Sequence, residues 1–288
     1  MENLEGRTAF ITGGARGIGL GIARALAREG VGLALVDIDQ TSLGTARAEL
    51  ARLVPTETYV LDVTDRDAYA RVANEARNAF GPITVLINNA GVVDSTAPTR
   101  LSYEMYDHVL GINLDGVYNG FQNFVPSMID TGTECHIVNT SSEAGLAQFG
   151  SGFLYHASKY AVVGLSESMR IELAPYGIGV SVLSPGPVAT DIVENARRAR
   201  PDTVPAHSAR VNALLDNAHR TLQDGVSIDD VGRLVVDGIR NNKAYIQTGN
   251  SSKGVVQARA AEIAAAMDYA TEFLERGQTL SSNGFDIR

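Results

Sequence analysis

The sequence contains one cysteine, fewer basic than acidic residues and no long hydrophobic run. Because Cys135 is the single thiol, an internal disulfide framework is excluded, and its place in TECHIVNTSS indicates a small core residue beside a strand. The 24 basic residues are outnumbered by 33 acidic ones, and the net charge of −9 argues against a nucleic-acid or anionic-membrane surface. No stretch approaches the length of a membrane span, and MENLEGRTAF lacks the pattern of a signal peptide. We therefore expect a cytoplasmic protein that handles small molecules.

The histidines show no spacing that is typical of metal ligands. No two of them have the His-x-x-x-His separation that places both imidazoles on one face of a helix. The five are His108, His136, His156, His207 and His219. We expect no metal site.

Short apolar runs alternate along the chain with longer amphipathic segments. The runs cover residues 7–12, 32–37, 58–62, 83–88, 136–141, 178–184 and 244–249. Apolar runs of this length separated by helices are typical of a parallel sheet that is covered on both faces. With 288 residues, of which 44% are hydrophobic, the chain can bury a large core. The sequence predicts an α/β fold, a doubly wound parallel sheet of the Rossmann type in a single domain over residues 1–288, with ligands at the C-terminal ends of the strands.

Two segments depart from this alternation. Residues 188–225 are polar, carry two prolines and are too long for an ordinary connection, so we interpret them as a helical substrate-binding lid. Residues 250–288 are a C-terminal helical extension, with a helix expected from Val255 to Arg276. Its apolar positions Ile263, Met267, Ala270 and Leu274 predict packing against the sheet or against a partner subunit.

A glycine-rich segment, TGGARGIG at residues 12–19, joins the first expected strand to the first expected helix. Gly13 permits a tight turn, Gly17 lets the backbone approach a pyrophosphate, and Gly19 allows close contact between helix and strand. The amides at the helix N-terminus would face the same anion. Such a loop at the first strand–helix junction of a parallel α/β chain predicts a dinucleotide site.

Asp37 ends the second expected strand, about 20 residues after the glycine loop. A carboxylate there can accept hydrogen bonds from the adenosine ribose hydroxyls and would repel a 2′-phosphate, so NAD is favoured over NADP. Arg16 argues in the other direction, because its guanidinium could pair with that phosphate. We expect Arg16 to turn instead to solvent or to a carboxylate of the protein.

Further motifs follow in a fixed order: Asp62-Val63, NNAG at 88–91, Asn113 in GINLDGV, Ser142 in NTSSEAG, Tyr155-x-x-x-Lys159, and SPGPVATD at 184–191. Together with the glycine loop they closely resemble the compact branch of the short-chain dehydrogenases/reductases, from residue 5 to about 250. The extended branch of that family has the loop TGxxGxxG and fits poorly, because residue 16 is arginine.

The resemblance implies four catalytic residues. Tyr155 would be the general acid/base, and Lys159, one helical turn away on the same face, would lower the pKa of the phenol. Ser142 would bind the substrate oxygen, whereas its neighbour Ser141 is expected to be structural. Asn113 would disturb the hydrogen bonding of its helix and hold a water that links Lys159 to solvent.

The resemblance also implies the cofactor contacts. Asp62 and Val63 would border adenine, while the backbone near Gly186 and Val188 and the hydroxyl of Thr190 would hold the nicotinamide amide. The full expected set is Gly13, Arg16, Gly17, Ile18, Gly19, Asp37, Asp62, Val63, Asn89, Ala90, Gly91, Tyr155, Lys159, Gly186, Val188 and Thr190.

The expected reaction is hydride transfer between NAD and a secondary alcohol or its ketone, in a homodimer or homotetramer. Apolar residues such as Leu146, Phe149 and Phe153 favour an apolar, aromatic or polycyclic substrate, for example an aryl, steroid or terpenoid alcohol. Two alternatives stay open. One is an NADPH-dependent reductase of acyl-carrier-bound substrates, for which RRAR at 197–200 could be a docking patch, and the other is a non-catalytic NAD-binding regulator.

Overall fold

The structure is a computed structural model that describes residues 1–149 and 152–277. The chain divides into two compact units, Met1–Gly249 and a second unit that begins at Asn250. The first unit contains the single sheet and its flanking helices. The end of the expected C-terminal extension, residues 278–288, lies outside the described residues.

The sheet has seven parallel strands in the order β3-β2-β1-β4-β5-β6-β7. They are β1 (Thr8–Thr12), β2 (Gly32–Asp37), β3 (Thr56–Val60), β4 (Val85–Asn88), β5 (Cys135–Thr140), β6 (Ile178–Ser184) and β7 (Tyr245–Gln247). The predicted parallel, doubly wound sheet is confirmed, with β3 starting and ending two residues before the expected run. The strand order reverses between β1 and β4, and this switch point is where such sheets bind ligands.

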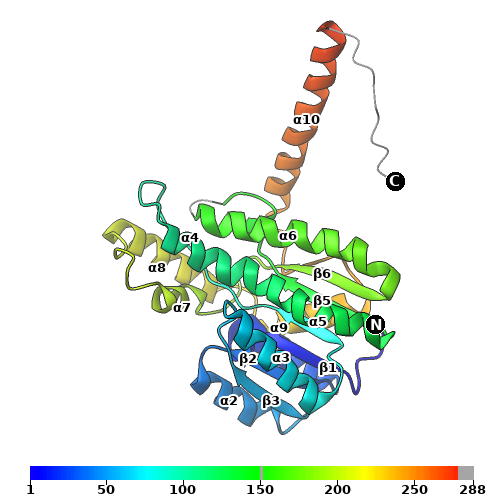
Figure 1. The fold of residues 1–288 in the computed structure, drawn as a ribbon. Helices are drawn as coiled ribbons and strands as arrows, with labels where there is room; N and C mark the ends of the chain where they lie inside the picture. The colour runs from blue at the N-terminus through cyan, green and yellow to red at the C-terminus, as the bar shows by residue number, and fades with distance from the viewer. Residues whose placement is uncertain (150–151, 278–288) are drawn as a thin grey trace. The chain divides into compact units, whose positions relative to one another are not determined.

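Helices cover both faces of the sheet (Figure 1). Those of the first unit are α1 (Gly17–Arg28), α2 (Gln40–Leu50), α3 (Arg66–Phe80), α4 (Tyr103–Leu110), α5 (Gly116–Thr131), α6 (Phe153–Leu173), α7 (Ile192–Ala199), α8 (Ala209–Gln223) and α9 (Ile228–Arg240). A π-helical segment, η1 (Gly111–Asp115), joins α4 to α5, and two 3₁₀ turns are η2 (Glu143–Gly145) and η3 (Ala174–Tyr176). The second unit holds α10 (Lys253–Gly277).

Successive strand residues contribute to opposite cores. In β1, Ile11 packs in one core with α1, α2 and α9, whereas Phe10 packs in the other with α3 and α5. In β2 the same alternation holds for Leu35 and Val36. Because both faces are buried, every strand residue of β1 and β2 is buried, and the sequence reads as a continuous apolar run. Among the described residues, no helix combines the length and apolar character needed to cross a bilayer.

A buried polar chain fixes β4, β5 and α6 to one another. The Asn88 amide donates to Asn139 Oδ1 (2.8 Å), and the Asn139 amide donates to Ser166 Oγ (2.9 Å). Gly120 of α5 lies against this chain, since a Cβ built on it would stand 2.2 Å from Asn88 Oδ1. A side chain at residue 120 would therefore displace Asn88 from its partner.

We predict that Gly120→Ala destabilises the fold by about 1–3 kcal/mol, because overpacking would outweigh the gain in helix propensity. The measurement is the midpoint of urea unfolding. Gly44→Ala in α2 is the matched control, since a Cβ there meets nothing within 4 Å and should stabilise by about 0.5–1 kcal/mol. Equal effects of the two substitutions would contradict the close contact at Gly120.

Candidate active site

A cavity of about 1600 Å³ opens at the C-terminal ends of the strands. Its volume exceeds the 300–1000 Å³ that is usual for one small ligand, so it has room for a cofactor and a substrate together. Of the residues predicted for catalysis and cofactor binding, all line this cavity except Gly19 and Asn113. The structure thus brings together segments that lie far apart in the sequence.

The glycine loop forms one end of the cavity. Gly17 has a φ of +52°, a conformation that favours glycine, and begins α1. Gly19 packs beneath the loop, because a Cβ on it would lie 2.0 Å from the carbonyl oxygen of Gly13. Arg16 is the N-cap residue of α1, and its side chain does not cap the amides of the first turn. These amides fit a pyrophosphate at the cavity end.

Asp37 is fixed at the end of β2 and is only 7% exposed. Its Oδ2 accepts from the Ala15 amide (3.3 Å), and its Oδ1 accepts from the Asp39 amide (3.1 Å). The Arg16 guanidinium lies 3.5 Å from Asp37 and 3.3 Å from Asp39, and donates to Asn195 Oδ1 (3.3 Å). As expected, Arg16 turns to carboxylates of the protein.

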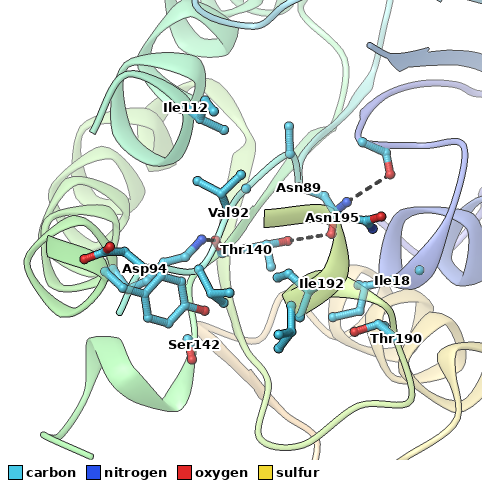
Figure 2. A pocket seen from close by; sticks show the side chains of 18 of the residues that line it. Ile18, Asn89, Val92, Asp94, Ile112, Thr140, Ser142, Thr190, Ile192 and Asn195 are labelled. Atoms are coloured by element: carbon cyan, nitrogen blue, oxygen red, sulfur yellow. Dashed lines mark hydrogen bonds between the residues drawn. The ribbon is translucent and has the colours of Figure 1, made fainter. Parts of the chain in front are cut away.

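Tyr155 and Lys159 stand one turn apart at the start of α6, beside Ser142 at the end of β5. Lys159 Nζ lies 5.7 Å from the centre of the Tyr155 ring and donates to the Thr140 carbonyl (3.0 Å). Ser142 Oγ accepts from the Ala144 amide (3.1 Å), which orients its hydroxyl over η2. Figure 2 labels Ser142, Thr140, Val92 and Asp94 among the side chains that line the cavity. Tyr155, Lys159 and Ser142 therefore face the same cavity.

Burial is the main influence on the pKa values of Tyr155 and Lys159. It raises the pKa of the Tyr155 phenol, although a hydrogen bond with Ser142 acts in the lowering direction. It lowers the pKa of Lys159 to about 8. The sequence led us to expect Lys159 to lower the phenol's pKa, and the structure gives the opposite net direction. The cause is that desolvation of the phenolate is the larger effect within the chain's own groups.

Asn113 lies behind the cavity, fully buried in the π-helical segment η1. Its amide donates to the Val92 carbonyl (2.9 Å) and to Ser158 Oγ (3.0 Å), and its Oδ1 accepts from the Val92 amide (2.8 Å). The expected disturbance of helical bonding is present, since the Gly116 amide bonds the Gly111 carbonyl five residues back. The side chain thereby joins η1, the strand-end segment after β4, and α6.

Two neighbours of the catalytic residues have structural contacts. Ser141 donates to the Lys159 carbonyl (2.9 Å), in agreement with its expected structural role. His156 accepts from the Phe149 amide (3.0 Å), and its Nδ1 bonds the Gly152 carbonyl (2.9 Å). This histidine therefore fastens the segment before α6. Within the described residues, no group of three or more histidine, cysteine or acidic side chains could hold a metal ion.

The expected lid contains two helices, α7 and α8. Leu214, Leu215 and Leu222 of α8 line the cavity. Arg197 of α7 joins the two helices, since its guanidinium lies 2.6 Å from Asp216 of α8. This part of RRAR is thus engaged inside the lid.

A family model described as short chain dehydrogenase matches residues 7–201, which is more than half of the chain. The chain belongs to the short-chain dehydrogenase family. A C alpha-dehydrogenase from Sphingobium sp. (strain NBRC 103272 / SYK-6) is 35% identical over 85% of this chain and 81% of its own length. A 3-oxoacyl-[acyl-carrier-protein] reductase from Thermotoga maritima is 36% identical over 66% of this chain and 78% of its own length. Among solved structures, a short chain dehydrogenase/reductase from Burkholderia phymatum in complex with NAD has a TM-score of 0.86 and 30% identity, over 99% of this chain and 100% of that one.

Several residues that support the site of this dehydrogenase escaped the sequence analysis. Thr140 accepts from Lys159 through its backbone, Ser158 accepts from Asn113, and Asn195 reaches Arg16 across a separation of 179 residues. Thr248 Oγ1 accepts from the Gly186 amide (2.9 Å). These contacts are long-range or use main-chain atoms, so no short motif signals them.

We predict that Lys159→Met removes turnover but raises the free energy of unfolding. The size of this stabilisation should depend on pH. Burial holds the Lys159 pKa near 8 in the fold against 10.5 ordinarily, so folding releases a proton between these values and the wild type loses stability as pH falls from 10.5 to 8. The stability advantage of the variant should grow by about 3 kcal/mol as pH falls across that range and stay level below pH 8. Denaturant unfolding of both proteins from pH 7 to 10 measures it, and a pH-independent difference would contradict the shifted pKa.

Proposed function

We propose that this protein is an NAD-dependent dehydrogenase that oxidises an uncharged, apolar secondary alcohol to its ketone, with Tyr155 as the general base. The observation that carries the proposal is the convergence of Tyr155, Ser142 and Lys159 in the cavity that also holds Asp37. One cavity would then bind both the cofactor and the substrate. Tyr155 would accept the proton, Ser142 would bind the substrate oxygen, and Asp37 would bind the ribose of the cofactor.

In the proposed mechanism, Ser142 donates a hydrogen bond to the alcohol oxygen and holds it against the Tyr155 hydroxyl. Tyr155 takes the alcohol proton while Lys159, as an ammonium, favours the phenolate by its charge. NAD, when bound, supplies the acceptor for the hydride. Asn113 fixes η1 beside Lys159 through its bonds to Val92 and Ser158, and we propose that a water beside this segment carries the proton on to solvent.

The preference for NAD rests on Asp37 and on the partners of Arg16. Asp37 is held by two backbone amides, so its carboxylate cannot easily turn away from a 2′-phosphate. Arg16 is occupied by Asp37, Asp39 and Asn195, which weakens its claim on that phosphate. The similar Burkholderia phymatum protein was solved with NAD, which agrees with this preference.

The proposed substrate is uncharged because of which side chains line the cavity. Among the described lining residues, Arg16 and Lys159 are the only arginine and lysine, and both belong to the cofactor and catalytic groups. Asp94 and Glu143 are among several acidic lining residues, and the residues of α8 that line the cavity are mainly apolar. A substrate carboxylate or phosphate would find no cation and would meet like charge. The apolar α8 face supports an aryl alcohol as the first class to test.

The second candidate is a reductase of acyl-carrier-bound substrates with NADPH. It is favoured by the Thermotoga maritima relative and by the basic RRAR segment. Engagement of Arg197 with Glu194 and Asp216 reduces the charge that this segment could offer to an acidic carrier. A non-catalytic NAD-binding protein would not need Tyr155, Lys159 and Ser142 together.

We expect Tyr155→Phe to lower turnover by about 10²–10⁴-fold, the usual contribution of general acid–base catalysis, while the Kd for NAD stays within a few-fold. Steady-state kinetics and NAD titration of the same preparation measure the two effects. Tyr160→Phe, in the next turn of α6, is the matched control. Retained turnover in Tyr155→Phe would remove Tyr155 from the mechanism.

We expect Asp37→Ala to shift the NADP-to-NAD ratio of kcat/KM upward by about 10- to 100-fold, because a like-charge contact that costs several kcal/mol is relieved. Asp39→Asn is the matched control, since it removes a charge from the same loop beside Arg16. An unchanged ratio in Asp37→Ala, or an equal change in the control, would count against Asp37 as the ribose-binding group.

We expect 1-phenylethanol to be oxidised with NAD and 4-(1-hydroxyethyl)benzoate to react at least about tenfold more slowly in kcat/KM, since the carboxylate loses its hydration without gaining a cation. NADH formation is followed for both alcohols at the same pH. Faster reaction of the carboxylate would show that the substrate is not selected for neutrality.

A further inference from the structure

The helix α10 carries apolar side chains that its own unit does not cover. It runs for 25 residues, Lys253–Gly277, and is the one described element of the second unit. Met267 is 66% exposed and Phe273 is 63% exposed, and Ile263 and Leu274 are also exposed. An isolated helix that presents so much apolar surface requires a further element to cover it.

Six apolar positions of α10 follow a heptad repeat, and the exposed side chains of Val255, Tyr269 and Phe273 lie in the column next to it. Val256, Ala260, Ile263, Met267, Ala270 and Leu274 are separated alternately by four and three residues. This mean period of 3.5 keeps a narrow seam on one side of the helix, which is the pattern of one helix pairing with another. Packing on a sheet or in a globular core uses a broader stripe with a period of 3.6.

Charges along α10 favour an antiparallel pair. The first half contains Lys253 and Arg259 with Glu262, for a net charge of +1, and the second half contains Asp268, Glu272 and Glu275 with Arg276, for a net charge of −2. In an antiparallel pair the basic half of one helix runs beside the acidic half of the other, and the helix dipoles oppose each other. A parallel pair would place like halves side by side.

An antiparallel pair of α10 helices is self-complementary when its two-fold axis lies at the level of residue 265. It places Val256 beside Leu274 of the partner subunit and Ile263 beside Met267 of the partner subunit. Ala260 then meets Ala270 of the partner subunit, where two small side chains allow the helices to approach closely. Each apolar layer thus finds an apolar layer, as an isologous interface requires.

We propose that α10 is a dimerisation element that pairs antiparallel with α10 of a second copy of this chain. The described lining residues of the active-site cavity all precede Asn250, so none of them belongs to α10. The proposal does not depend on the substrate or on the cofactor.

Cross-linking at the two ends of α10 tests the direction of pairing. We prepare two variants of the full chain separately, Val256→Cys and Leu274→Cys. The two are mixed, allowed to exchange subunits and treated with a short bis-maleimide. Buried Cys135 is present in all samples. We expect covalent dimers of the mixed type only, since two copies of residue 256 would stand about 27 Å apart at 1.5 Å per residue. Dimers within each single variant would show a parallel pair, and an absence of dimers in the mixture would show that α10 is covered in another way; either result overturns the proposal.

A charge placed in the seam tests its contribution to assembly. Ile263→Glu should weaken the association measured by sedimentation equilibrium at least tenfold, because it buries a carboxylate among apolar side chains. Ala265→Glu, on the opposite side of the helix, is the matched control and should leave the association within a few-fold of the wild type. Both variants should bind NAD as the wild type does, which separates loss of pairing from loss of folding. Equal association of Ile263→Glu and the wild type would overturn the proposal.

Discussion

The burial of a charged lysine is the constraint on which the active site depends. Lys159 is only 3% exposed, and its Nζ donates to the Thr140 carbonyl at the end of β5. Close backbone approach is needed around it, because a Cβ on Gly91 would stand 3.3 Å from Nζ and 3.1 Å from Asn113 Oδ1. The π-helical segment η1 supplies Asn113 at this place. Three separate parts of the chain are therefore shaped by the position of one ammonium group.

This arrangement sets function against stability. Desolvation disfavours the ammonium of Lys159 and the phenolate of Tyr155, so each group is driven toward its neutral form by the same burial. The two charged forms stabilise each other only if they occur together. A bound cofactor with a positively charged ring would add to the field that favours the phenolate. Strain of this kind is retained where catalysis needs it, and the rest of the fold supplies the compensating stability.

The sequence was sufficient for the fold, and most of the residues that it proposed for the site line one cavity. Buried parallel strands give unbroken apolar runs. The glycine loop and the Tyr155–Lys159 pair are each recognisable within a few consecutive residues, and Asp37 is recognisable by its place at the end of the second strand. The net direction of the Tyr155 pKa was not predictable, because it depends on how completely the folded chain excludes water from the phenol. Contacts such as Arg16 with Asn195, or Asn88 with Asn139, join distant segments through polar atoms, and no local pattern marks them.

Burial within the chain holds the proton on Tyr155, and we propose that the combined charge of Lys159 and bound NAD releases it for acid–base catalysis. The most direct test is a pH titration of the phenolate absorbance of Tyr155, taken as the difference between the wild type and Tyr155→Phe, with and without saturating NAD. We expect Tyr155 to ionise above the usual range of a tyrosine in the protein alone and at clearly lower pH with NAD. Ionisation at the same pH in both conditions would contradict it.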